Sequence, residues 1–149
     1  EWLFNEEFGP HLLTAENDTG FIEPPWKAVL SNKGILPILW ELFPEHPNLL
    51  PAYWEQDRRL GDSWIAKPIL GREGANMRLQ SPGLTMETDG KYGDQPKIFQ
   101  KLAKLGKVDG MYISIGSWVV GGQSAGMCVR EDEQPIIVDK SRLVPHVFR

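Results

Sequence analysis

The 149-residue sequence contains one cysteine, Cys128, and no long apolar stretch. A single thiol excludes an internal disulfide framework and fits a reducing compartment, so we expect a cytoplasmic protein. The longest apolar run, residues 35–40, includes Pro37 and is far shorter than the ~20 residues that a membrane-spanning helix needs. We therefore expect no membrane partner.

Histidine and basic charge are also scarce. The three histidines, His11, His46 and His146, are too widely spaced for a zinc motif, so we predict no metal ligand in this chain. Lysine and arginine total 16 against 20 acidic residues, which gives a net charge of −4. This balance excludes a generally basic nucleic-acid surface but allows a local basic pocket, so we expect no nucleic-acid partner.

The composition is that of a folded domain. Hydrophobic residues make up 41% and charged residues 24%, which argues against disorder, and the length suits one domain. The chain begins Glu1-Trp2, without an initiating methionine and without a signal-peptide pattern. We expect residues 1–149 to form a single partial domain of a longer protein.

The first 62 residues are predicted to be mainly helical, with a proline-rich connection at their end. Apolar spacing and breaker residues predict helices at 2–13, 24–31 and 35–43. Pro44, Pro47 and Pro51 then stiffen the connection, because each proline fixes its own backbone angle.

From residue 63 the pattern changes to that of strands. Residues 63–95 are predicted to form a hairpin with strands at 64–70 and 77–80, followed by a polar turn or mobile loop at 81–95. Residues 96–149 are predicted to be antiparallel, with strands at 111–120, 127–130 and 135–138 and a turn at 121–126. Residues 98–105 fit a short strand or a helical turn. Helices followed by antiparallel hairpins indicate an α+β fold.

The strongest local signal for chemistry is the loop of the first hairpin. Gly71 and Gly74 allow backbone N–H groups to approach an anion closely, and Lys67 and Arg72 add positive charge, which favours a phosphate cradle. No Gly-Lys-Ser/Thr ends the loop and no helix follows it, so it differs from a P-loop and from a dinucleotide fingerprint. The alternative is a flexible turn with solvated charges.

Three further features each allow a functional and a structural interpretation. Lys33, at the break between two predicted helices, fits either a ligand contact or a solvated surface charge. The acidic residues 131–133 could hold Mg²⁺ or form a solvated strand edge. Cys128 lies in an alternating apolar strand, which favours a buried, inert thiol over a nucleophile.

Several segments match a known family in the same order along the chain. They are EPPWK at 23–27, SNKGILPILW at 31–40, HPNLLPAY at 46–53, KPILGREGAN at 67–76, DGMY at 109–112, the stretch 116–132 that begins GSWVVGG, and RLVPH at 142–146. Each match alone is weak, but the ordered set covers most of the chain and is specific. It resembles the carboxy-terminal part of the glutathionylspermidine synthase family, whose synthetase domain is a circularly permuted ATP-grasp fold.

The resemblance implies an ATP-dependent carboxylate–amine ligase. Such an enzyme forms an acyl-phosphate on the glycine carboxylate of glutathione, which spermidine then attacks, with ATP and Mg²⁺ as cofactors. It also implies the residues of an ATP site. The phosphates would be held by Lys33 and Lys67, and a glycine-rich lid over them would comprise Gly71, Arg72, Gly74, Ala75 and Asn76. The adenine would be lined by Gln100, Lys101, Leu102 and Ala103. The pocket would be completed by Ser114, Pro135, Ile136 and Ile137.

In the family, the Mg²⁺ carboxylates and most of the glutathione site lie upstream of the matched region. We therefore expect this chain to be the ATP-binding part of the ligase and to be inactive by itself. The alternative is a nucleotide-binding or structural domain without ligase activity. An upstream segment with the metal ligands would favour the enzyme.

Overall fold

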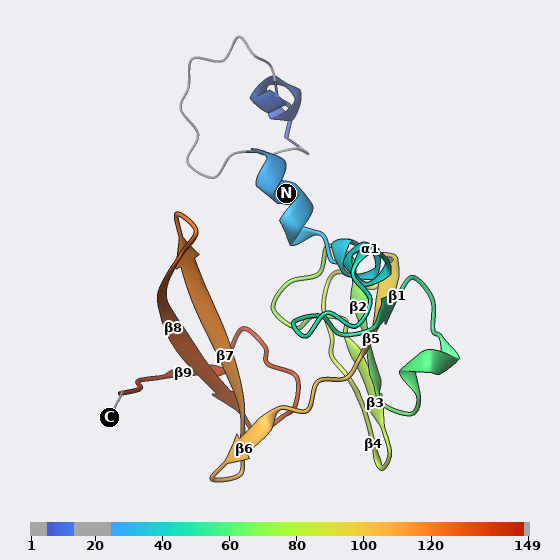
Figure 1. The fold of residues 1–149 in the computed structure, drawn as a ribbon, viewed down its shortest axis with the longest axis vertical. Coiled ribbons are helices and arrows are strands. Elements are labelled where there is room, and N and C mark those ends of the chain that lie inside the picture. The colour runs from blue at the N-terminus through green and yellow to red at the C-terminus, as the bar shows by residue number, and fades with distance from the viewer. Residues whose placement is uncertain (1–5, 14–24, 148–149) are drawn as a thin grey trace.

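The computed structural model describes residues 6–13 and 25–147, in which short helices precede two antiparallel sheets (Figure 1). The helical elements at the start are the 3₁₀ helices η2 (Gly9–Leu13) and η3 (Pro25–Ser31) and the α-helix α1 (Ile35–Leu42). The α+β class is thus confirmed. The helices expected near 24–31 and 35–43 are present, and the start of the one expected at 2–13 lies outside the described residues.

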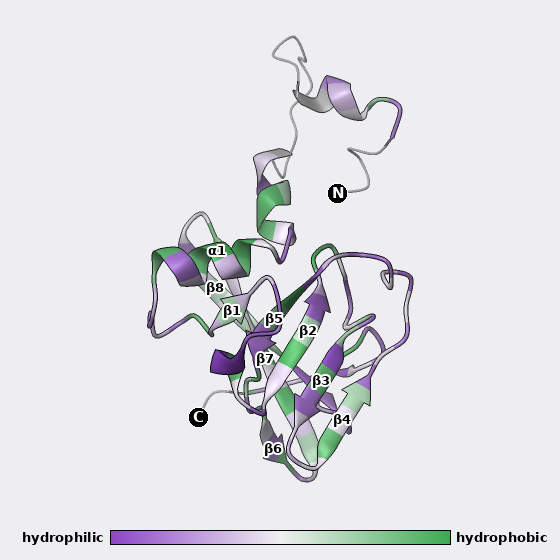
Figure 2. Ribbon diagram, turned by 90° about the vertical axis from the view of Figure 1, so that its right-hand side faces the viewer, coloured by the Kyte–Doolittle hydropathy of each residue, from purple (hydrophilic) through white to green (hydrophobic). Residues whose placement is uncertain are grey.

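The first sheet has five strands in the order β1-β5-β2-β3-β4. Their bounds are β1 (Ala52–Tyr53), β2 (Trp64–Pro68), β3 (Arg78–Ser81), β4 (Leu84–Glu87) and β5 (Lys97–Lys101). β2 lies in the middle, and its apolar centre is visible in Figure 2. Because side chains alternate along a strand, β2 contributes to a core cluster on each face. One cluster contains Leu60, from the 3₁₀ helix η4 (Arg58–Leu60), and the other contains Leu79.

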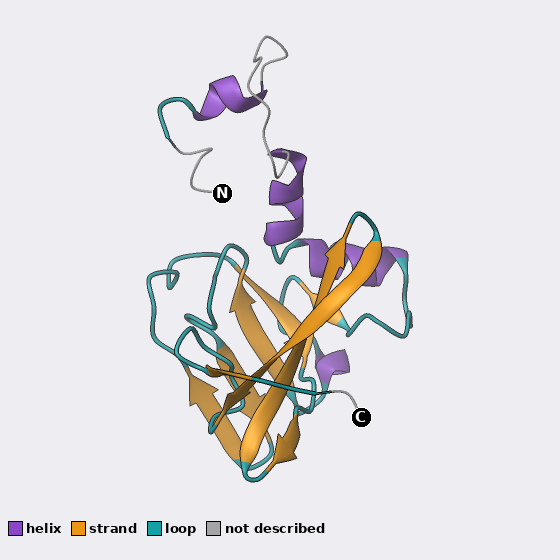
Figure 3. Ribbon diagram, turned by 90° about the vertical axis from the view of Figure 1, so that its left-hand side faces the viewer, coloured by secondary structure: helices purple, strands orange, loops and turns teal. Residues whose placement is uncertain are grey.

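The second sheet has four strands in the order β6-β7-β8-β9. Their bounds are β6 (Gly106–Val108), β7 (Met111–Val120), β8 (Gln123–Asp132) and β9 (Arg142–Val144). The long β7–β8 hairpin crosses in front of the first sheet in Figure 3, so the two sheets form two layers. Gly121 and Gly122 have φ values of 56° and 77°, as a two-residue hairpin turn requires.

Several sequence expectations for the sheets need correction. Residues 81–95 are not only a loop, because they contain β4, which pairs with β3. The turn expected at 121–126 is confined to the two glycines, since β8 already begins at Gln123. Residues 135–138 do not form the last strand, which is β9 instead. The undecided stretch 98–105 resolves at its start into a strand, β5.

Residues 133–141, here called the connector, join β8 to β9 and run between the two sheets (Figure 1). Ile136 in this segment is 3% exposed and packs with Ile65 and Leu79 of the first sheet. This burial explains the wrong strand prediction, because the apolar signal came from docking against another sheet rather than from strand pairing. β5 also belongs to the first sheet, so that sheet continues past the boundary expected at residues 95 and 96.

Within the described ranges, none of the helices is long and apolar enough to cross a membrane.

Candidate functional site

Lys67 lies on the face of the first sheet that the connector covers. In the register of β2 with β5, Ile65 lies opposite Gln100 and Lys67 lies opposite Ile98, so Lys67 and Gln100 are diagonal neighbours on one face. The Lys67 Nζ donates a hydrogen bond of 2.7 Å to the Gln100 Oε1, and Gln100 is 7% exposed. Among the described residues the partner of this ammonium is therefore a neutral amide rather than a carboxylate.

The second predicted lysine, Lys33, reaches the same region from the break between η3 and α1. Its backbone N–H donates to the carbonyl of Ile69 at 2.8 Å, and its Nζ donates to the carbonyl of Gly71. These bonds attach the Lys33 segment to the first residues after β2. The structure thus brings both lysines to one end of β2.

Burial is the larger cause that lowers the pKa of Lys67, and the positive charge of Lys33 is the second. Together they bring the pKa from its ordinary value of 10.5 to about 8. Both causes disfavour the charged lysine, so an anion placed between the two ammonium groups would relieve the repulsion and raise this pKa. The pair therefore has the electrostatics of an anion site.

The loop after β2, residues 71–76, here called the lid loop, adopts left-handed backbone conformations at three positions. Glu73, Gly74 and Asn76 have φ values of 55°, 70° and 51°. The N–H of Ala75 donates to the Arg72 carbonyl at 2.9 Å. The N–H groups of Glu73 and Gly74 have no acceptor among the residues that the structure describes, which leaves two donors for an external anion.

Residues 88–92, which the sequence assigned to a polar loop, fix the far side of this lid loop. The Thr88 Oγ1 donates to the Gly74 carbonyl at 2.5 Å and accepts from the Met77 N–H at 3.0 Å. The Asn76 Oδ1 accepts from the Tyr92 N–H at 2.7 Å. Sequence reasoning missed Thr88 and Tyr92. The alternating pattern of β4 just before them was the signal that could have shown an ordered segment here.

The connector closes the other side of the lid loop. A Cβ built on Gly74 would lie 2.6 Å from the Ile137 carbonyl oxygen and 3.1 Å from the Ile136 Cγ2, so only glycine fits. Leu102 packs against the cluster that contains Ile136. The lid loop, the end of β5 and the connector therefore meet, and Pro135 lies half-buried beside them.

Three of the predicted residues contribute differently from this group. The Lys101 side chain lies on the opposite face of the sheet, where its Nζ donates to the Leu60 carbonyl at 2.8 Å. Ala103 is exposed beyond the end of β5. Ser114 lies on β7 in the second sheet, opposite Arg130, whose Nη2 donates to the Val138 carbonyl at 2.5 Å.

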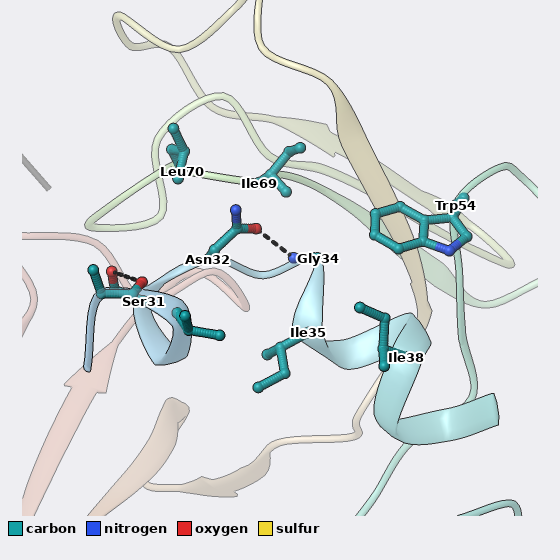
Figure 4. A pocket seen from close by; sticks show the side chains of 10 residues that line it. Ser31, Asn32, Gly34, Ile35, Ile38, Trp54, Ile69 and Leu70 are labelled. Atoms are coloured by element: carbon teal, nitrogen blue, oxygen red, sulfur yellow. Dashed lines mark hydrogen bonds between the residues drawn. The ribbon is translucent and has the colours of Figure 1, made fainter. Parts of the chain in front are cut away.

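Apart from the lysine pair, an apolar cavity of about 440 Å³ lies between η3, α1 and the residues that follow β2 (Figure 4). Trp54, Ile38 and Ile69 are among its apolar lining, and the Asn32 Oδ1 at its edge accepts from the Gly34 N–H at 2.8 Å. None of the residues predicted for the ATP site lines it. The cavity adjoins the Lys33 segment but is distinct from the lysine pair.

The acidic residues 131–133 do not converge on a metal site. In the described part of the chain, no group of three or more His, Cys, Asp or Glu side chains could hold a metal ion. Asp132 instead accepts from the Ser141 hydroxyl at 2.5 Å and from the Gln134 N–H at 2.9 Å, and these bonds, the first above all, hold the pKa of its carboxyl below the usual value. Its role in this structure is to hold the connector.

Comparison with known proteins defines the family. All 149 residues match the family described as "Glutathionylspermidine synthase preATP-grasp", and the chain belongs to that family. A Haemophilus influenzae protein, named only provisionally as an acid–amine ligase, is 43% identical over 99% of this chain and 39% of its own length. The Escherichia coli bifunctional glutathionylspermidine synthetase/amidase is 41% identical over 83% of this chain and 20% of its own length.

A third relative, trypanothione synthetase of Crithidia fasciculata, is 37% identical over 84% of this chain and 20% of its own length. The resemblance inferred from the ordered motifs is thereby confirmed. The chain spans about two fifths or less of each of these relatives.

Proposed function

We propose that this chain supplies the ATP-binding part of an ATP-dependent acid–amine ligase. The observation that carries the proposal is the pair formed by Lys33 and Lys67, in which Lys67 is buried against a neutral amide and its pKa is lowered to about 8. Keeping a desolvated ammonium without a carboxylate partner costs stability, so the pair is best explained by an anionic ligand.

The described residues fit the phosphates of ATP. The two ammonium groups would neutralise the phosphoryl charge, and the open N–H groups of Glu73 and Gly74 would donate to phosphate oxygens. Arg72 in the same loop adds a further positive charge. Positioning and charge neutralisation of this kind account for most of the catalysis of phosphoryl transfer. Mg²⁺ would supply charge neutralisation on the phosphates, with its ligands in residues outside those described here.

The fold supports placing the nucleotide between the two sheets, as in an ATP-grasp domain. Gln100 and Leu102 lie on the covered face of the first sheet, and Ile136 and Ile137 approach that face from the connector. We propose that the adenine lies beside the end of β5, bounded by Gln100, Leu102 and Ala103 on one side and by residues 135–137 on the other. Lys101 would contribute only its backbone, and Ser114 would act through the connector.

The relatives support glutathione and a polyamine such as spermidine as the substrates. In the proposed reaction the glycine carboxylate attacks the γ-phosphorus of ATP and releases ADP, and the spermidine amine then displaces phosphate from the acyl-phosphate to form the amide. The chain's own residues would hold the phosphates during the first step. A nucleotide-binding role without ligase chemistry is the alternative.

Assay of the full-length protein tests the two alternatives. We expect ATP-dependent amide formation from glutathione and spermidine, with ADP released in equal amount. The 149-residue chain assayed alone is expected to release no ADP above a protein-free control. ATP binding by the full-length protein without any amide product, across a panel of acids and amines, would leave only the non-catalytic alternative.

Amide hydrogen exchange at the lid loop tests the phosphate contact directly. We expect the N–H groups of Glu73 and Gly74 to exchange rapidly without nucleotide and slowly with ATP and Mg²⁺, because phosphate oxygens would then accept hydrogen bonds from these groups. The N–H of Thr88, which donates to the Met77 carbonyl at 3.0 Å, is the internal control and should be protected in both states. Equal exchange at Glu73 and Gly74 in both states would contradict the proposed lid.

A further inference from the structure

Ser141, at the carboxyl end of the connector, is the centre of a buried hydrogen-bond group that no nucleotide contact explains. It is 8% exposed, and its Oγ accepts from the Val138 N–H at 2.7 Å while donating to the Asp132 Oδ2 at 2.5 Å. Its own N–H donates to the Val138 carbonyl at 3.1 Å. One hydroxyl thus ties the end of β8 to the middle of the connector.

The peptide that Ser141 fixes is the one against which the lid loop rests. Besides its contact with the Ile137 carbonyl, a Cβ on Gly74 would lie 3.1 Å from the Val138 Cγ1. On its other side, Gly74 is held by the Thr88 hydroxyl through its carbonyl. Gly74 is therefore clamped between Thr88 and the connector, and its position depends on where residues 137–138 lie.

A second bond acts on the same peptide from the second sheet. The Arg130 Nη2 donates to the Val138 carbonyl at 2.5 Å and to the Asp139 carbonyl at 3.3 Å. The Val138 N–H thus donates to Ser141 of the connector itself, and the Val138 carbonyl accepts from Arg130 of β8, whereas Ile136 packs the same connector against the first sheet. The connector therefore contacts both β8 and the lid loop.

We propose that Ser141 is a positioning residue for the lid loop: by fixing the 137–138 peptide, it sets the position at which Gly74 and its neighbour present their N–H groups. This inference rests on the proposed function for its effect on ATP, but not for its effect on the loop. In the described part of the chain, the hydrogen bonds of Ser141 go to Val138 and Asp132, and none goes to the lid loop or to the lysine pair.

Ser141→Ala in the full-length protein is the test. We expect amide exchange at Ala75, within the lid loop, to become faster, and ATP affinity to fall by about 2- to 30-fold, the range typical of substitutions that act on a site through intervening contacts. Ser141→Thr keeps a hydroxyl and should restore both values to near wild type. Amide exchange in β2 and β5 should not change, which separates loosening of the loop from general loss of structure.

Gly74→Ala provides the coupling measurement, because its Cβ disturbs the same contact from the loop side. We expect the two substitutions to be non-additive, so that the double variant binds ATP about as weakly as the weaker single variant. Independent, multiplicative effects would overturn the inference. If Ser141→Ala does not fold, Arg130→Met removes the bond to the Val138 carbonyl, and the same non-additivity with Gly74→Ala is expected.

The outcomes separate this inference from the proposed function. Unchanged Ala75 exchange and unchanged ATP affinity in Ser141→Ala, with a wild type that binds ATP, would overturn the positioning role alone. A wild type that binds no ATP would overturn the proposed function, and Ala75 exchange would still decide the role of Ser141.

Discussion

Lys67→Met in the full-length protein is expected to weaken ATP binding by about 10- to 150-fold, because a hydrogen bond from a charged donor contributes about 1.5–3 kcal/mol. Methionine keeps the apolar stem of the side chain and removes only the ammonium. The measurement is ATP affinity by calorimetry, paired with the melting temperature of the unliganded protein. Lys104→Met, at an exposed lysine beyond β5, is the matched control and should change neither value.

The melting temperature is expected to change little in Lys67→Met, because two effects oppose each other. Loss of the ammonium removes a charge that burial and Lys33 both disfavour, which stabilises the fold. The same loss leaves the buried Gln100 Oε1 without its donor, which costs about 1–3 kcal/mol. A large fall in melting temperature with unchanged ATP affinity would show that Lys67 is a structural residue and would contradict its phosphate role.

The elements that the sequence predicted correctly are those in which local signals agree with the final packing. The β7–β8 hairpin combines long β-rich stretches with two consecutive glycines, and it formed where expected. The turn was predicted four residues too long because Gly126 was counted with it. In the structure Gly126, at φ 125°, lies within β8 beside the register shift at Trp118 and Val119. A glycine in the sequence can therefore indicate either a turn or an irregularity within a strand.

The errors arose where tertiary contacts determine the conformation. Residues 135–138 look like a strand because they are apolar and β-branched, but their Ile136 is buried against Leu79, which lies 57 positions earlier in the sequence and in another sheet. β4 was missed because three of its four residues are exposed, so it lacks the buried apolar face that identifies a strand. The long-range contact of Ile136 has no local signature, and β4 offers only the weak alternation of its four residues.

The candidate site shows the same division between local motif and distant contact. The residues alone left Lys33 and the glycine loop open between a ligand site and solvated charges, and only the family resemblance linked them. The structure brings Lys33 and Lys67 together. The opposite orientation of Lys101 follows from strand alternation once β5 is known to be a strand, a choice that the sequence left open. Thr88 and Ser141 act through single hydroxyl groups on the lid loop and the connector, and a hydroxyl carries no sequence signal of its partner.

The pH dependence of ATP affinity is the second large effect expected. With the pKa of Lys67 at about 8, the free protein loses the binding-competent ammonium as the pH rises, so affinity should fall about tenfold between pH 7 and pH 9. The ratio of wild-type to Lys67→Met affinity isolates this titration from that of ATP itself. A ratio that stays constant over this range would contradict the lowered pKa or the phosphate contact.

Stability without nucleotide should change with pH in the opposite direction. Because the folded-state pKa of Lys67 is below that of the unfolded chain, the unfolded state binds more protons between pH 8 and 10.5, and this group raises the free energy of unfolding as the pH rises through that window. Lys67→Met should lack the increase. Denaturant unfolding at several pH values measures both.

Lys33→Met connects the two measurements. Lys33 is the second cause of the lowered pKa, so its neutralisation should raise the pKa of Lys67 and move the fall in affinity to higher pH, even though the loss of one cation weakens ATP binding at every pH. A merely structural Lys33 would lower affinity, if at all, without moving the midpoint. The two lysines share one electrostatic site if the midpoint of the fall in ATP affinity moves to higher pH in Lys33→Met and if Lys67→Met shows no such fall.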